Sequence, residues 1–106
     1  MLKVYLSPLA EKKLSLLLDY IENEWAKKER DDFFEKILDS FNRVAIHPES
    51  CSKSQTFPDL FKCVVSKQTS FFYRYNSTDL EIITIFDNRQ DPQKVKTELE
   101  KILKDA

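Results

Sequence analysis

The sequence predicts an α+β fold in which a helical hairpin packs against a mostly antiparallel sheet. In the N-terminal half, apolar residues recur at the three- and four-residue spacing of amphipathic helices. Between residues 60 and 87 they form short runs separated by polar breaks, as in consecutive strands. Helices that each bury one stripe need a shared partner, and the strands supply it. We therefore expect one domain over residues 1–106: an N-terminal strand, a helical hairpin, a three-stranded antiparallel meander and a short C-terminal helix.

The N-terminal segment predicts a strand that leads directly into the first helix. Val4 and Leu6 alternate with polar neighbours, which indicates a short strand with one buried face. Ser7-Pro8 supplies the residue types favoured at a helix N-cap and at the first helical position. The helix is expected from Pro8 to about Lys27. Its apolar stripe comprises Leu14, Leu17, Leu18, Ile21 and Trp25.

A mixed charge cluster at residues 27–32 predicts the turn of the hairpin. The second helix is expected from Phe33 to His47, where the following proline disfavours helical backbone. Residues 48–58 are mostly polar and predict a surface loop. Strands are expected at about 60–66, 70–76 and 80–87, and a last helix from Pro92. The aromatic residues expected in the core are Trp25, Phe33, Phe41, Phe72 and Phe86.

Composition excludes several classes of function. The formal net charge is −1, so no global positive field attracts nucleic acid. The chain contains no glycine, which excludes a P-loop, a Gly-rich dinucleotide turn and a Gly-x-Ser-x-Gly nucleophile elbow. No signal peptide or membrane-spanning run is evident, so we expect a cytoplasmic protein without membrane contact. In that reducing compartment, Cys51 and Cys63 are expected to be free thiols.

The predicted sheet carries the residues that could perform chemistry. These candidates are Lys62, Lys67, Arg74, Tyr75 and Arg89. Period-two alternation places Arg74 and Tyr75 on opposite faces unless a bulge intervenes. The only histidine, His47, is expected at a helix end, so the sheet lacks a general acid–base of ordinary pKa.

The segment that ends the last strand, Asp87-Asn88-Arg89-Gln90, allows two interpretations. Asp87 and Arg89 could pair with each other, or Asp87 could cap the turn before Pro92. Alternatively, Arg89 could face a binding target, because side chains leave the packed core at a strand end. Arg74, Lys62 and Lys67 likewise fit either solvated surface cations or functional groups.

Several motifs, taken in order, resemble those of one known family. They are Val4-Tyr5-Leu6-Ser7-Pro8-Leu9-Ala10, Tyr20-Ile21 with Trp25, Tyr73-Arg74-Tyr75, and the aliphatic run Ile82 to Phe86 that leads into Asp87-Asn88-Arg89-Gln90-Asp91-Pro92. This series resembles the RelE/ParE superfamily of toxins from bacterial type II toxin–antitoxin pairs, and its ParE-like branch most closely. The resemblance covers nearly the whole chain.

The resemblance implies a growth-inhibiting, plasmid stabilisation-like toxin that binds DNA gyrase or a related topoisomerase. Such a toxin is not itself an enzyme and needs no cofactor or metal. A cognate antitoxin would neutralise it, with contacts along the hairpin and the C-terminal helix, in a possible toxin–antitoxin heterotetramer. The residues expected to bind the target are Arg74, Asp87, Asn88, Arg89 and Gln90.

Two alternatives stay open at this point. A RelE-like member would cut mRNA on the ribosome without metal, with Lys62, Arg74, Tyr75 and Arg89 as catalytic residues. Phe61, where family members often carry arginine, and the missing sheet histidine are departures from that pattern. A degenerate member would only bind a partner and would not be toxic.

Overall fold

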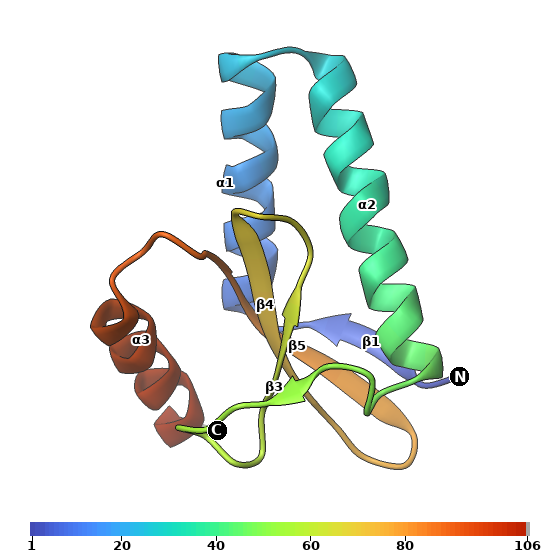
Figure 1. The fold of residues 1–106 in the computed structure, drawn as a ribbon, viewed down its shortest axis with the longest axis vertical. Coiled ribbons are helices and arrows are strands. Elements are labelled where there is room, and N and C mark those ends of the chain that lie inside the picture. Colours follow the sequence, from blue (N-terminus) through green and yellow to red (C-terminus); the bar gives the residue numbers. More distant parts are fainter. Residues whose placement is uncertain (106) are drawn as a thin grey trace.

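The computed structural model describes residues 1–105 and contains a five-stranded sheet with helices packed on both faces (Figure 1). The elements in chain order are β1 (Lys3–Leu6), α1 (Pro8–Glu24), α2 (Lys27–Ile46), β2 (Ser52–Lys53), β3 (Phe61–Val64), β4 (Thr69–Tyr75), β5 (Asp79–Asp87) and α3 (Pro92–Asp105). The strand order is β1-β5-β4-β3-β2, with β1 parallel to β5 and the other pairs antiparallel. The predicted α+β class is confirmed.

The helical hairpin begins where β1 ends, and Ser7 fixes that junction. Its Oγ accepts a hydrogen bond from the Ala10 amide at 3.0 Å and donates one to the Ile83 carbonyl at 2.6 Å. The first bond caps α1, and the second ties the cap to β5. The closed end of the hairpin then rises beyond the sheet (Figure 1).

The predicted hairpin turn at residues 27–32 is wrong, because this segment forms the first turns of α2. The connection between the helices is only Trp25 and Ala26. Lysine, glutamate and arginine are good helix formers. Except for the partly buried Arg30, the charged side chains of this segment are exposed, because this end of the hairpin projects past the sheet.

The two faces of the sheet carry separate cores. The face toward α1 and α2 holds the larger one, which includes Ile37, Phe41, Phe71 and Tyr73. The face toward α3 holds a smaller one, which comprises Leu60, Phe72, Ile83, Phe86, Val95 and Leu99. The core prediction is confirmed for Phe41, Phe72 and Phe86, and Phe33 packs partly buried against the larger core. It is wrong for Trp25, which is 63% exposed because it follows the end of α1 at a level where no strand lies beneath it.

The loop predicted at residues 48–58 contains the two-residue strand β2, which pairs with β3 at the edge of the sheet. That pairing places Cys51 beside Cys63, and the two form a disulfide. The expectation of free thiols is therefore wrong. The spacing of the cysteines could not reveal the bond, because it depends on the unpredicted β2–β3 register.

The C-terminal helix begins as the sequence predicts. Asp91 acts as its N-cap, with Oδ1 accepting a hydrogen bond from the Gln93 amide at 3.0 Å. The helix packs on β5 through the smaller core, and Glu98 forms an ion pair with Lys13 of α1. Within the described residues, no helix has the length and apolar character needed to cross a membrane.

Candidate functional site

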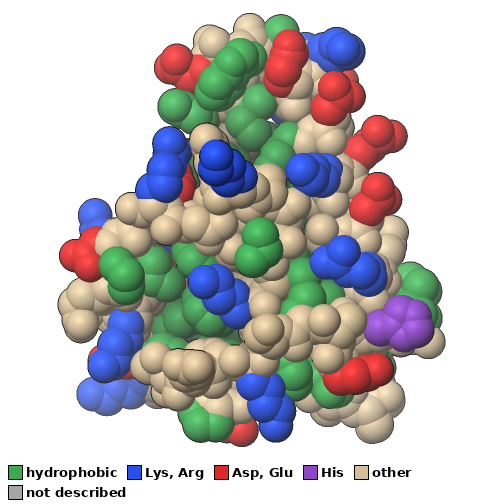
Figure 2. All heavy atoms as spheres, viewed as in Figure 1, with side chains coloured by type: hydrophobic (Ala, Val, Ile, Leu, Met, Phe, Trp, Pro, Cys, Tyr) green, Lys and Arg blue, Asp and Glu red, His purple; other side chains and the backbone are tan. Residues whose placement is uncertain are grey.

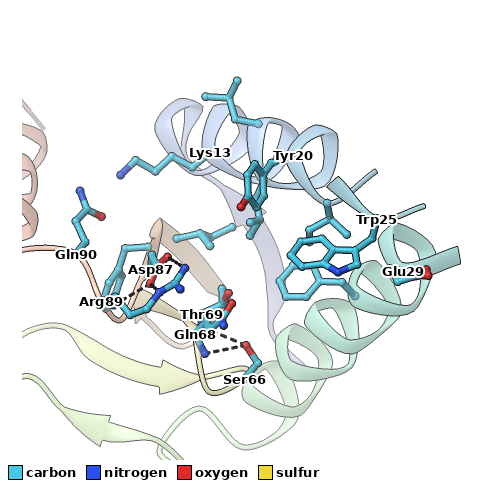
Figure 3. A pocket seen from close by; sticks show the side chains of 16 residues that line it. Lys13, Tyr20, Trp25, Glu29, Ser66, Gln68, Thr69, Asp87, Arg89 and Gln90 are labelled. Carbon is cyan, nitrogen blue, oxygen red and sulfur yellow. Dashed lines mark hydrogen bonds and ion pairs between the residues drawn. The ribbon is translucent and has the colours of Figure 1, made fainter. Parts of the chain in front are cut away.

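A large open groove runs between the closed end of the hairpin and the end of β5 (Figure 3). Its volume is about 870 Å³. We call it the hairpin groove. It is lined by α1, the start of α2, the β3–β4 turn and the segment after β5. The side chains that line its two opposite sides include Leu16, Tyr20, Trp25, Asp87, Arg89 and Gln90.

One wall of the groove is apolar and exposed. Leu16 is 59% exposed, Tyr20 54% and Trp25 63%. The rings of Tyr20 and Trp25 meet edge to face with centroids 6.1 Å apart, so each helps to hold the other in place. Neighbouring apolar side chains left in water in this way are characteristic of a protein-binding surface.

The opposite side of the groove carries an ion pair at the end of β5. The Arg89 guanidinium donates hydrogen bonds to both carboxylate oxygens of Asp87, from Nε at 3.1 Å and from Nη2 at 2.8 Å. The Arg89 amide also donates to Asp87 Oδ1 at 2.8 Å. These bonds to Arg89 lower the pKa of Asp87 below its usual range, and the hydrogen bond with Asp87 raises the pKa of Arg89. The predicted Asp87–Arg89 pairing is present.

The ion pair does not remove Arg89 from the surface, since its side chain is 69% exposed. In Figure 3, Arg89 and Asp87 lie across the groove from Tyr20. A bidentate pair holds the guanidinium in one orientation and leaves its remaining donors available. A planar cation is thus presented opposite an aromatic wall.

Asn88 and Gln90 flank Arg89 and have different surroundings. Asn88 Oδ1 accepts a hydrogen bond from Ser70 Oγ at 2.6 Å, and Nδ2 donates to the Lys67 carbonyl at 3.2 Å. Asn88 thus ties the β3–β4 turn to the end of β5. Gln90 lines the hairpin groove and also a smaller pocket of about 200 Å³ beside α3.

The remaining candidate residues lie outside the hairpin groove. Arg74 forms an ion pair with Glu81 of β5 at 2.9 Å. Glu81 lies six residues before Asp87, so the two ion pairs are separated by about 20 Å along the strand. Lys62 lies over the Phe86 ring, 5.6 Å from its centroid, on the α3 side of the sheet. Tyr75 stacks with Tyr73 and contacts Phe61 at a tilted angle on the hairpin side. Lys62, Arg74, Tyr75 and Arg89 are therefore not brought together.

Basic side chains are nevertheless frequent on one face. Figure 2 shows lysine and arginine side chains spread across that face, whereas aspartate and glutamate lie mostly toward its rim. Lys67 is exposed in the β3–β4 turn, and His47 is the exposed C-cap of α2. Among the residues described, no group of three or more histidine, cysteine, aspartate or glutamate side chains is arranged to hold a metal ion.

The sequence interpretation missed the apolar wall of the groove. The predicted core includes Trp25 and the predicted stripe omits Leu16, although both side chains are exposed here. A signal was nevertheless present, because α1 carries apolar residues at Leu16 and Tyr20 in addition to its buried stripe. An apolar arc wider than one core requires is a sign of a second contact surface.

Comparisons with known proteins agree with this fold. The family of the ParE toxin of the type II toxin–antitoxin system parDE matches residues 4–92. A chain from the chromosomal ParDE TA system of P. aeruginosa superposes with a TM-score of 0.70 at 11% identity, covering 82% of this chain and 96% of that one. A conserved hypothetical protein from Helicobacter pylori gives a TM-score of 0.54 at 14% identity, covering 85% and 98%. No curated protein sequence gave a match.

Proposed function

We propose that this chain, which belongs to the ParE toxin family of type II toxin–antitoxin systems, inhibits DNA gyrase or a related topoisomerase by binding it. The contact is made by the end of β5, with Arg89 as its centre and Asp87 and Gln90 beside it. The protein acts as a cytoplasmic growth inhibitor and is not an enzyme. A cognate antitoxin neutralises it, and the two assemble as a heterotetramer.

One observation carries the proposal. The hairpin groove joins two sets of residues that are distant in sequence: the exposed aromatic wall of α1 and the ion pair after β5. The first set suits an antitoxin that folds on the hairpin, and the second suits a target contact. Because both line one groove, an antitoxin seated there covers Arg89. The antitoxin would then neutralise the toxin by competing with the target for the hairpin groove.

The chemistry of the groove supports binding more than catalysis. Exposed tyrosine, tryptophan and arginine side chains are the types enriched in protein interfaces. RNA cleavage would need a base, an acid and a cation gathered around one phosphate. Arg74 and Arg89 are each paired with a carboxylate, and Tyr75 lies on the other side of the sheet from Lys62.

The antitoxin segment is proposed to be an amphipathic helix that places its apolar side against Leu16, Tyr20 and Trp25. This mode of recognition uses anchors spaced one turn apart along the bound helix. A helix of that kind can be disordered before binding and can fold on the toxin. It would exclude water from the tyrosine and tryptophan rings and end near Arg89.

The first experiment separates the proposed target from translation. The chain is induced in cells, and covalent DNA–gyrase cleavage complexes and protein synthesis are followed in parallel. We expect cleavage complexes to accumulate before synthesis falls. Rapid loss of synthesis with cut mRNA and intact DNA would instead establish the ribosome-dependent nuclease. Absence of any growth effect would identify a non-toxic binding member.

A second experiment tests the groove with matched variants. Arg89→Gln should reduce toxicity at least tenfold, whereas Arg74→Gln, outside the groove, should retain it (an order-of-magnitude expectation for a central interface residue). Tyr20→Ala combined with Trp25→Ala should weaken antitoxin capture. Phe34→Ala serves as its control, because Phe34 is an exposed hairpin aromatic that does not line the groove. Equal losses for groove and control variants would refute the assignment.

A further inference from the structure

The disulfide lies at the edge of the sheet, away from the hairpin groove. Cys51 immediately precedes β2, and Cys63 lies within β3. The ladder pairs Ser52 with Lys62, so the next position along it sets Cys51 opposite Cys63. Their Cα atoms are 5.2 Å apart. The bond therefore crosses from the outermost strand to its neighbour.

The two sulfurs have different surroundings. Cys63 is 1% exposed and packs in the larger core, whereas Cys51 is partly exposed. An external thiol can therefore approach the disulfide from the side of Cys51. This asymmetry defines which sulfur is attacked first.

A cation stands beside the buried sulfur. The Nη2 atom of Arg43, in the last turn of α2, donates a hydrogen bond to Cys63 Sγ at 3.2 Å. A neighbouring guanidinium stabilises a thiolate. A thiol of lower pKa also leaves faster in exchange. Arg43 thus favours departure of Cys63 when the bond is broken.

We propose that Cys51–Cys63 is a reversible thiol–disulfide exchange site whose reaction partner is a dithiol. One thiolate of the dithiol attacks Cys51 Sγ, the sulfur–sulfur bond breaks, and its electron pair moves to Cys63 Sγ. Cys63 departs as a thiolate held by Arg43. The second thiolate of the dithiol then attacks the dithiol's own sulfur in the mixed disulfide. Cys51 is released and takes a proton from water, and the dithiol ends as a disulfide.

The oxidised form of the same dithiol drives the reverse reaction. In that direction Cys51 forms the mixed disulfide, and Cys63 is the resolving group because the Arg43 guanidinium beside it favours its thiolate form. Each direction transfers two electrons, from the dithiol to the protein or back. No other oxidant or reductant takes part.

Reduction of the disulfide removes the covalent link between the edge strand β2 and its neighbour β3. Without the disulfide, β2 is attached by its short ladder to β3 and by the hydrogen bond from the Ser54 amide to the Leu60 carbonyl, at 2.8 Å. Tyr73 adds a hydrogen bond from its hydroxyl to the Pro48 carbonyl at 2.7 Å. A two-residue strand held by so few bonds opens readily. Reduction should therefore expose the outer edge of β3.

The first test maps the attacked sulfur in the unaltered protein. The folded chain is treated briefly with reduced glutathione, quenched with acid, and mapped by peptide mass spectrometry. We expect the glutathione adduct on Cys51 and a free thiol at Cys63. An adduct mainly on Cys63 would overturn the assignment of the two sulfurs.

The second test measures the contribution of Arg43. Reduction by dithiothreitol is timed for the wild type, Arg43→Gln and Lys36→Gln, a control that removes an exposed cation from the same helix. We expect reduction to slow about threefold or more in Arg43→Gln and to be unchanged in the control. Equal rates in all three proteins would refute the role of Arg43. Circular dichroism establishes that each variant is folded.

The third test measures the consequence for the sheet edge. Hydrogen exchange is compared between the oxidised protein and the protein kept reduced with excess dithiothreitol. We expect faster exchange at Ser54 and along residues 51–63, with the β4–β5 ladder unaffected. Unchanged exchange at the edge would show that reduction does not release β2.

Discussion

The two faces of the sheet differ in the size of their buried cores and in the helices that cover them. The hairpin face is covered by two long helices and the α3 face by one helix; among the residues that the structure describes, the first encloses thirteen buried core residues and the second six. The first core is continuous from α1 through the strands to α2. The second depends on a helix joined to β5 by a short segment after Asp87. The hairpin face thus secures the fold, while the α3 face is a local attachment.

The largest effect should come from opening a cavity in the hairpin face. Phe71 is completely buried, and its ring meets that of Phe41 edge to face at 5.0 Å. Phe71→Ala should lower the free energy of unfolding by about 3–5 kcal/mol. Urea denaturation followed by far-UV circular dichroism measures the loss. A decrease below about 1 kcal/mol would contradict the conclusion that the hairpin-face core provides most of the stability.

A smaller effect is expected on the α3 face. Leu99 is 1% exposed in the smaller core, and Leu99→Ala should cost about 2 kcal/mol, the lower end of the usual range, because α3 can detach locally. Hydrogen exchange should then accelerate in α3 while the amides of β4 and β5 stay protected. Leu14→Ala on the hairpin face is the matched control, for which exchange should rise across the whole sheet. Uniform acceleration in both variants would show that the two faces open together.

A single hydrogen bond within the larger core gives the third prediction. Burial raises the pKa of Tyr73 to about 12, and its neutral hydroxyl donates to the Pro48 carbonyl. Because the folded pKa exceeds the unfolded value of about 10, the neutral hydroxyl stabilises the protein below pH 10, and this contribution is lost as the pH rises toward 12. Tyr73→Phe should cost about 1 kcal/mol at neutral pH and remove that alkaline component.

The measurement is a series of urea transitions between pH 8 and pH 11 on the wild type and Tyr73→Phe. Their stabilities should converge as the pH rises. Parallel curves would mean that the Tyr73 hydroxyl does not titrate with unfolding.

The smallest effect on stability should come from the exposed ion pair in the hairpin groove. Arg89→Gln should leave the urea midpoint nearly unchanged, since solvent screens exposed pairs. It should, however, return the pKa of Asp87 toward its usual range, which NMR titration of the carboxyl carbon can follow. The depressed pKa means that the pair stabilises the fold above the unfolded pKa of Asp87 and that this is lost as the pH falls through the folded value. An unchanged Asp87 titration would show that the pair does not persist in solution.

Sequence reasoning succeeded where one local cause dominates. Short apolar runs separated by polar breaks located the strands between Leu60 and Asp87 within a few residues, because strands buried on both faces are apolar along most of their length. The caps at Ser7 and Asp91 were predictable because short polar side chains satisfy the free amides of a helix start.

Sequence reasoning failed where the structure or exposure of a segment depends on which other elements pack against it. The charges at residues 27–32 suit both a turn and a solvated helix, and the charge pattern alone does not decide between them. Trp25 continues the spacing of a buried stripe but extends beyond the strands that would cover it. The disulfide needed the register of β2 on β3. The groove itself joins residues more than sixty positions apart, which no local pattern encodes.

The projecting end of the hairpin has a consequence for how such a protein diversifies. Tyr20 and Trp25 near that end are exposed and belong to neither buried core, so their replacement should leave both cores intact. Recognition can therefore drift from one lineage to another while the scaffold is retained. Substitution of these surface residues alone can thus change which protein the groove binds.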